Sequence, residues 1–68
     1  MRQSEIVEQA VYIGSRYKRR KVLCLTAGYK TATVKFVGID KHGITADAPQ
    51  YMTLPAFAVW AQEKANDI

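Results

Sequence analysis

Positive charge in this chain is concentrated in one hexapeptide, Arg16-Tyr17-Lys18-Arg19-Arg20-Lys21. No Asp or Glu occurs between Glu8 and Asp40, so no neighbour in the sequence neutralises it. Clustered Lys and Arg side chains bind phosphates and release the counterions that surround them. Tyr17 adds a ring on which a base can stack. The predicted nucleic-acid-binding residues are Arg16, Tyr17, Lys18, Arg19, Arg20, Lys21, Lys30 and Lys35.

Two other interpretations of the hexapeptide remain open. Runs of Lys and Arg also occur in solvated loops that keep small proteins soluble, and they attract acidic protein surfaces. The net charge of +4 and the pI of about 9.5 fit all three. The partner is therefore either DNA or RNA, or an acidic host protein that this chain would serve as adaptor or inhibitor. Tyr12 and Tyr29 are further candidates for base stacking if they lie near the hexapeptide.

The other residues capable of chemistry do not form a catalytic pattern. A histidine can act as a general base, but His42 falls in an expected hairpin tip at 40–43 with only Asp40 nearby to orient it. Cys24 lies within the apolar run Val22–Thr26, which predicts a buried and unreactive thiol. One Cys and one His are too few for a usual zinc site. We therefore expect no catalytic residue, no metal, no cofactor and no enzymatic activity.

Length and composition predict a single small domain over residues 1–68, with a lead-in or short helical turn at 1–10. The apolar fraction is 49%, which is typical of a globular protein. No apolar run is long enough for a membrane helix or suits a signal peptide, so we expect a cytoplasmic protein without membrane contact. A core this small often gains stability from self-association, which makes a homo-oligomer possible.

Apolar patterning predicts a mainly β fold. The clearest strand is 31–39, where Ala32, Val34 and Phe36 alternate with polar neighbours and share one face. Asp40 and Gly43 then supply the residues of a tight turn. The expected strands are 11–13, 22–26, 31–39, 44–46 and 51–52. Such short strands within a twisted sheet at 11–52 predict a small SH3-like barrel of four to five antiparallel strands.

A helix is expected at 54–65, after the sheet. Thr53 is a suitable N-cap, and Pro55 falls in the first turn, where its missing N–H costs nothing. The apolar residues recur at helical spacing and predict a buried stripe of Leu54, Phe57, Ala58 and Ala61. Trp60 lies at the edge of this stripe, so it fits either the core or a partner interface. Tyr51 is open to the same two interpretations.

The closing segment, Thr53-Leu54-Pro55-Ala56-Phe57-Ala58-Val59-Trp60-Ala61, has the form Ser/Thr-Leu-x-x-Phe-x-x-Trp-Ala. It resembles a group of small, uncharacterised phage and mobile-element proteins with an SH3-like sheet. The resemblance implies a capped helix docked on the sheet and no reaction. The expected architecture is also similar to the plasmid-borne type II dihydrofolate reductases. Their Val-Gln-Ile-Tyr motif is not matched by the nearest stretch, 49–52, so we do not expect that activity.

Overall fold

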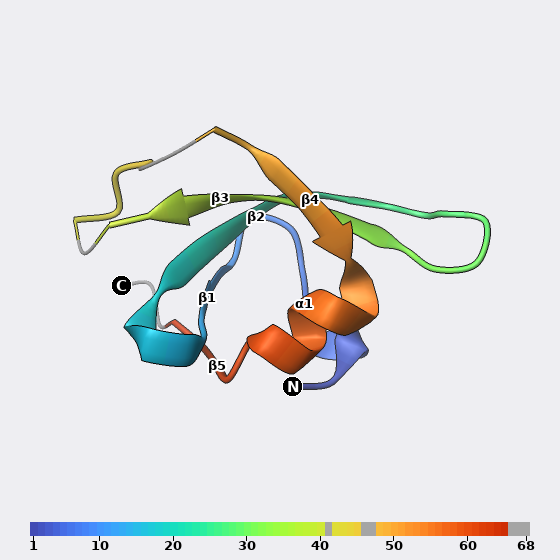
Figure 1. Cartoon of the computed structure of the whole chain (residues 1–68), viewed down its shortest axis with the longest axis horizontal. Coiled ribbons are helices and arrows are strands. Elements are labelled where there is room, and N and C mark those ends of the chain that lie inside the picture. The colour runs from blue at the N-terminus through green and yellow to red at the C-terminus, as the bar shows by residue number, and fades with distance from the viewer. Residues whose placement is uncertain (41, 46–47, 66–68) are drawn as a thin grey trace.

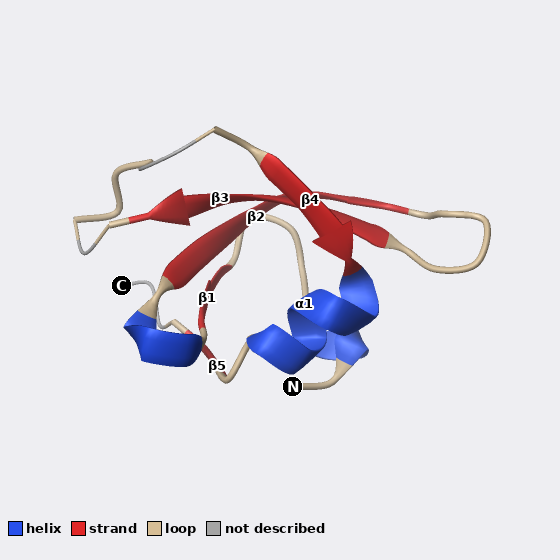
Figure 2. Ribbon diagram, viewed as in Figure 1, coloured by secondary structure: helices blue, strands red, loops and turns tan. Residues whose placement is uncertain are grey.

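The computed structural model describes residues 1–40, 42–45 and 48–65. Among these residues, five strands form one antiparallel sheet with the order β4-β3-β2-β1-β5 (Figures 1 and 2). The strands are β1 (Val11–Ile13), β2 (Arg19–Thr26), β3 (Thr33–Ile39), β4 (Gln50–Thr53) and β5 (Glu63–Lys64). The helices are α1 (Leu54–Trp60) and two single turns of 3-10 helix, η1 (Gln3–Glu5) and η2 (Ser15–Tyr17).

The sheet is an open meander to which the last strand returns. Strands β1 to β4 pair in sequence order, and β5 pairs with the free side of β1. In the described part of the chain, β4 and β5 are the two edges of the sheet. The mainly β class, the antiparallel pairing and a short helix after the sheet are therefore confirmed.

The core lies between the sheet and α1, and the ring of Phe57 is at its centre. Phe57 is fully buried and lies 5.6 Å from the Tyr12 ring and 5.7 Å from the Phe36 ring, between centroids. Val22 and Val34 fill the space around these rings and are also fully buried. The expected inward face of the third strand is confirmed, since both Val34 and Phe36 point into this core.

Helix α1 is shorter than the predicted 54–65. The Thr53 hydroxyl accepts a hydrogen bond from the Ala56 N–H at 3.3 Å, which confirms the N-cap. The helix ends at Trp60 because the chain then turns to the sheet, where the Gln62 and Ala65 N–H groups bond to carbonyls of β1. The prediction of helix for 61–65 was therefore wrong. Sequence periodicity cannot show that the edge of β1 is free to accept hydrogen bonds from these N–H groups.

The strands also differ from their predicted bounds. Strand β2 begins at Arg19, three residues before the apolar run, because β1 and β3 pair with its basic start. A bulge between Val22 and Cys24 shifts the register and leaves Cys24 half-buried, so the fully buried thiol was a wrong prediction. The return strand at 44–46 is reduced to one bridge, Ile39 to Thr45, and Ala46 lies outside the described residues.

The N-terminal segment closes the core from below the sheet. The expected short helical turn within 1–10 is η1. The Tyr12 hydroxyl donates to the Glu5 carbonyl at 2.7 Å and accepts from the Val7 N–H at 2.8 Å. The amino group of Met1 donates to the Ala58 carbonyl of α1 at 3.2 Å. These bonds fix residues 1–7 against Tyr12 and the helix.

Among the described residues, no helix has both the length and the apolar character needed to cross a membrane.

Gly14→Ala tests the packing of α1 against the turn after β1. Gly14 has a negative φ, so Ala is allowed by the backbone, but its Cβ would overlap the Trp60 indole. We expect unfolding in urea to show a loss of about 1–3 kcal/mol, as overpacking typically costs. The neighbouring Ser15→Ala, at an exposed site, should change stability by less than about 0.5 kcal/mol. Equal stabilities of the two variants would contradict the packing.

Candidate functional site

The basic hexapeptide forms the corner between β1 and β2. Its first residues lie in η2, where Arg16 and Tyr17 adopt left-handed φ values of 61° and 58°. The Gly14 N–H bonds to the Lys18 carbonyl at 3.0 Å and closes this turn. Lys18 follows η2, and Arg19 to Lys21 are the start of β2. The prediction of a loop or strand end is therefore confirmed, since the segment is both.

Strand geometry distributes the cations of β2 over two faces. Successive side chains of a strand point to opposite sides, and Arg20 lies on the core side, opposite Tyr12 in the register. Arg19 and Lys21 consequently point to the other face. The five cations do not form one flat patch, which the sequence alone does not reveal.

Arg20 is built into the edge of the core. Its guanidinium carbon lies 4.6 Å from the centroid of the Phe36 ring and 4.3 Å from that of Trp60. Its Nη1 also contacts the Met52 sulfur at 3.6 Å. A guanidinium between two aromatic faces gains cation–π attraction and loses rotational freedom. Arg20 therefore presents a positively charged group at a fixed place where the core meets solvent.

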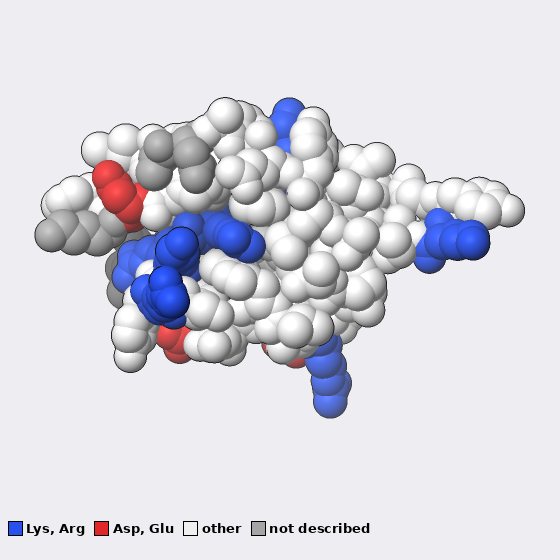
Figure 3. All heavy atoms as spheres, viewed as in Figure 1, with Lys and Arg blue, Asp and Glu red and all other residues white. Residues whose placement is uncertain are grey.

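An open groove lies beside this guanidinium. It has a volume of about 350 Å³, and its lining residues are Lys18, Arg19, Arg20, Phe36, Gly38, Ile39 and Gln50. Figure 3 shows the main concentration of Lys and Arg on the surface over η2 and the start of β2. Three cations thus border a floor that is partly apolar. Sequence analysis assigned Phe36 to the core alone and had no signal for Gln50, because β4 brings Gln50 next to Phe36 only in the folded sheet.

The two lysines expected beside the basic segment lie at different places in the sheet. Lys30 is in the loop between β2 and β3, at the end of the hairpin opposite to Arg19. Lys35 pairs with Cys24 and Tyr51 in the middle of the sheet, and it lies on the face opposite to Phe36. Lys30 therefore lies apart from the basic segment, contrary to the suggestion that it extends it. Lys35 is on the face to which Arg19 and Lys21 point, two residues along β3 from Val37, the partner of Lys21.

The tyrosines divide in the same way. Tyr12 is fully buried with its hydroxyl bonded, so it has no face on which a base can stack. Tyr17 is 86% exposed beside the basic corner. Tyr29 is exposed too, but it lies in the β2–β3 loop far from that corner. Of the stacking candidates, only Tyr17 accompanies the cations of the groove.

Trp60 and Tyr51 do not share a surface. Trp60 is half-buried, 5.3 Å from the Phe57 ring and in contact with Arg20, which favours a packing role. Tyr51 lies on β4, opposite Lys35 and on the face away from the core, and it is 68% exposed. A partner interface at either residue stays a prediction.

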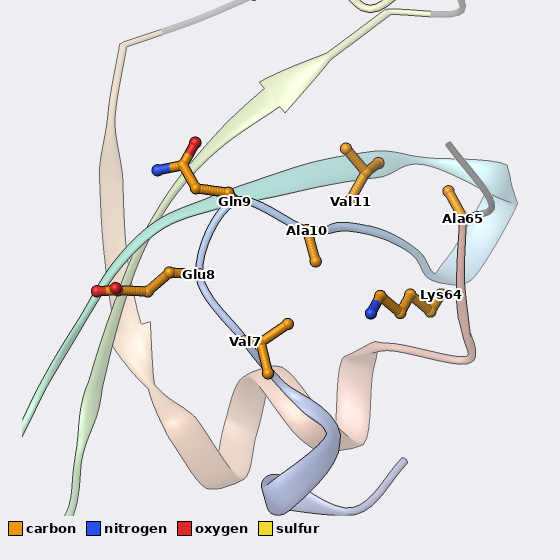
Figure 4. A pocket seen from close by; sticks show the side chains of 7 residues that line it. All are labelled: Val7, Glu8, Gln9, Ala10, Val11, Lys64 and Ala65. Atoms are coloured by element: carbon orange, nitrogen blue, oxygen red, sulfur yellow. The ribbon is translucent and has the colours of Figure 1, made fainter. Parts of the chain in front are cut away.

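Two further hollows flank the sheet. One lies on the face opposite to α1, where Arg19 and Lys21 border an apolar floor that includes Val11, Ile13 and Ile39. The other is drawn in Figure 4, between residues 7–11 and β5.

Among the described residues that line the hollow in Figure 4, Lys64 is the single cation and no acid is directed into the space. The Lys64 side chain extends into the space beside Ala10, whereas Glu8 points away. The Glu8 carboxylate instead accepts a hydrogen bond from the Leu25 N–H at 2.8 Å. No acid–base pair faces this hollow among the residues that line it.

Asp40 and His42, the residues considered for general-base chemistry, belong to the turn after β3. The Asp40 carboxylate accepts hydrogen bonds from the N–H groups of His42 (2.8 Å) and Ile44 (3.0 Å). It therefore holds the backbone of the turn, and Gly43 closes this turn with a φ of +79°. Within residues 1–40, 42–45 and 48–65, no group of three or more His, Cys, Asp or Glu side chains could hold a metal ion.

Comparison of the chain with protein-family models, with curated proteins and with solved structures gave no match. The arguments about function therefore depend on the residues and geometry of this chain alone.

Arg20→Ala separates the structural role of this arginine from the solvent-facing Arg19. We expect Arg20→Ala to reduce the free energy of unfolding by about 1–2 kcal/mol, because the Phe36 and Trp60 rings lose their contact with the guanidinium. Arg20→Lys should recover part of the loss, since it keeps the charge but not the planar group. Arg19→Ala should remain within about 0.5 kcal/mol of the unchanged protein. A larger effect at Arg19 than at Arg20 in urea titrations would refute the assignment.

Proposed function

We propose that this protein is a non-enzymatic nucleic-acid-binding module that contacts the sugar–phosphate backbone through the groove of Lys18, Arg19 and Arg20. The observation that carries the proposal is this groove itself: three cations meet the edge of an aromatic ring, and none of the described residues that line the groove is acidic. Phosphate groups would neutralise the cations, and the release of counterions would drive binding.

Each cation has a different part in the proposed contact. Lys18 and Arg19 are exposed and adapt to the position of a phosphate. Arg20 is held between two rings, so it would pay little side-chain entropy on binding. Tyr17, beside them, would stack on a base or sugar. Because backbone contacts carry little sequence information, we expect weak preference among sequences.

We also propose that the sheet is an SH3-like barrel left open on one side. The support is the meander of four strands, the return of β5 to β1 and the position of α1 beneath the bent sheet (Figure 2).

A phage or mobile-element origin is a further proposal, supported by the closing segment 53–61 alone. The proposed cytoplasmic location is supported by a single cysteine, which leaves no internal disulfide.

The second candidate is a protein-interaction module that binds a host protein. It is favoured by the edge strand β4, along which Tyr51 is exposed, and by Val59 on α1, which is 85% exposed. An extended peptide can add to such an edge, and so can a second copy of the chain.

Purification separates these candidates. A nucleic-acid binder would co-purify with nucleic acid at low salt and absorb strongly at 260 nm. An adaptor would purify without it, and a homo-oligomer would exceed 7.6 kDa in solution.

Removal of Lys18 and Arg19 tests the groove while leaving Arg20 in place. For K18A/R19A we expect the affinity for labelled DNA or RNA at low salt to fall by about tenfold or more. The slope of log K against log salt should become shallower by about 1 to 2, because two phosphate contacts are lost. Fluorescence anisotropy over a salt series measures both quantities.

The matched control is R2A/K64A, which removes the same charge from residues that do not line the groove. It should retain most of the affinity and the original slope. If both double variants weaken binding equally, net charge and not the groove is responsible, and the proposed site is wrong.

A further inference from the structure

The hairpin of β2 and β3 extends beyond the rest of the molecule. In Figure 1 its tip is the green loop at the right, far from the corner formed by η2. The register confirms the separation, because Arg19 pairs with Ile39 at one end and Thr26 pairs with Thr33 at the other. Seven steps of a strand span about 23 Å, and the loop lies further out. The tip is therefore about 25 Å or more from Arg19, at the far end of the groove, within a molecule 35 Å long.

The tip presents an aromatic ring and a cation to solvent. Tyr29 is 99% exposed, and Lys30 is exposed beside it. The loop is tightly built: a Cβ on Gly28 would overlap the Thr31 carbonyl oxygen, so the turn fits only glycine there without a shift. A fully solvated Tyr contributes nothing to the core, and a ring with an adjacent cation is suited to contact a base or sugar and its phosphate.

We propose that Tyr29 and Lys30 form a second contact for the same nucleic acid, and that its preferred form is a duplex of about eight base pairs or more. The inference depends on the proposed function of the groove. Figure 3 shows the cations of the corner and of the hairpin tip on one face of the molecule, with an uncharged surface between them. One ligand can therefore reach both.

The distance between the two contacts favours a duplex. Base pairs rise by about 3.4 Å each, so about eight of them span the roughly 25 Å between Arg19 and the tip. A duplex is stiff over this length, since its persistence length is about 150 base pairs. Once the groove holds one end, the phosphates near the tip are already in place. A flexible single strand would have to be ordered over the same distance, which costs conformational entropy.

Affinity as a function of duplex length tests the second contact. The probes are labelled DNA stem-loops with stems of 5 and 12 base pairs and a common loop. The proteins are the unchanged chain, Y29A/K30A, and Arg2→Ala as the charge control. The ratio of affinities between variant and unchanged protein is compared at each length, which cancels the greater number of binding positions on the longer stem.

We expect Y29A/K30A to bind the 12-base-pair stem about 3- to 10-fold more weakly and the 5-base-pair stem nearly as well as the unchanged protein. Arg2→Ala should show no such dependence on length, and the thermal midpoint of Y29A/K30A should be unchanged because both side chains are exposed. An equal loss on both stems, or no loss on either, would overturn the second contact. The same length dependence on single strands of 5 and 12 nucleotides would overturn the preference for a duplex. Absence of binding of the unchanged protein to these stems and single strands, and to their RNA counterparts, at low salt would instead overturn the proposed function.

Discussion

The position of the Phe57 ring is the constraint on which the rest of this small structure depends. Within the described part of the chain, its ring packs against the aromatic residues of β1, β3 and α1 together, namely Tyr12, Phe36 and Trp60. With about a dozen buried side chains in the described part of the chain, no second cluster could replace it. The cap at Thr53 and the bonds of Tyr12 to residues 5 and 7 set where this ring meets the sheet.

The same aromatic cluster positions the candidate site. Phe36 and Trp60 both pack against Phe57, and both rings also lie near the Arg20 guanidinium. The groove is thus the solvent edge of the core, and its central cation is held by the residues that hold α1. Binding and stability are therefore coupled. A ligand that contacts Arg20 binds the folded state alone, so it would also stabilise the packing of α1 against β2.

The sequence was sufficient to predict the mainly β class, the core face of β3, the cap at Thr53 and the charge of the 16–21 segment, since each follows from local residue type and period. It was insufficient wherever two distant segments decide the outcome. The end of α1 depends on the free edge of β1. The division of Arg19, Arg20 and Lys21 between two faces depends on β2 beginning three residues early. The roles of Phe36 and Gln50 in the groove depend on strand register, and the separation of Lys30 from the corner depends on hairpin length.

The most direct test of the central claim is the binding of the unchanged protein to labelled single- and double-stranded DNA and RNA, followed by anisotropy across a salt series. If the groove and its neighbouring cations contact about three to five phosphates, binding to a duplex should be micromolar or tighter at low salt. The plot of log K against log salt should then have a slope of about −3 to −4.5. No binding to any of these probes at low salt, or binding without dependence on salt, would contradict the account.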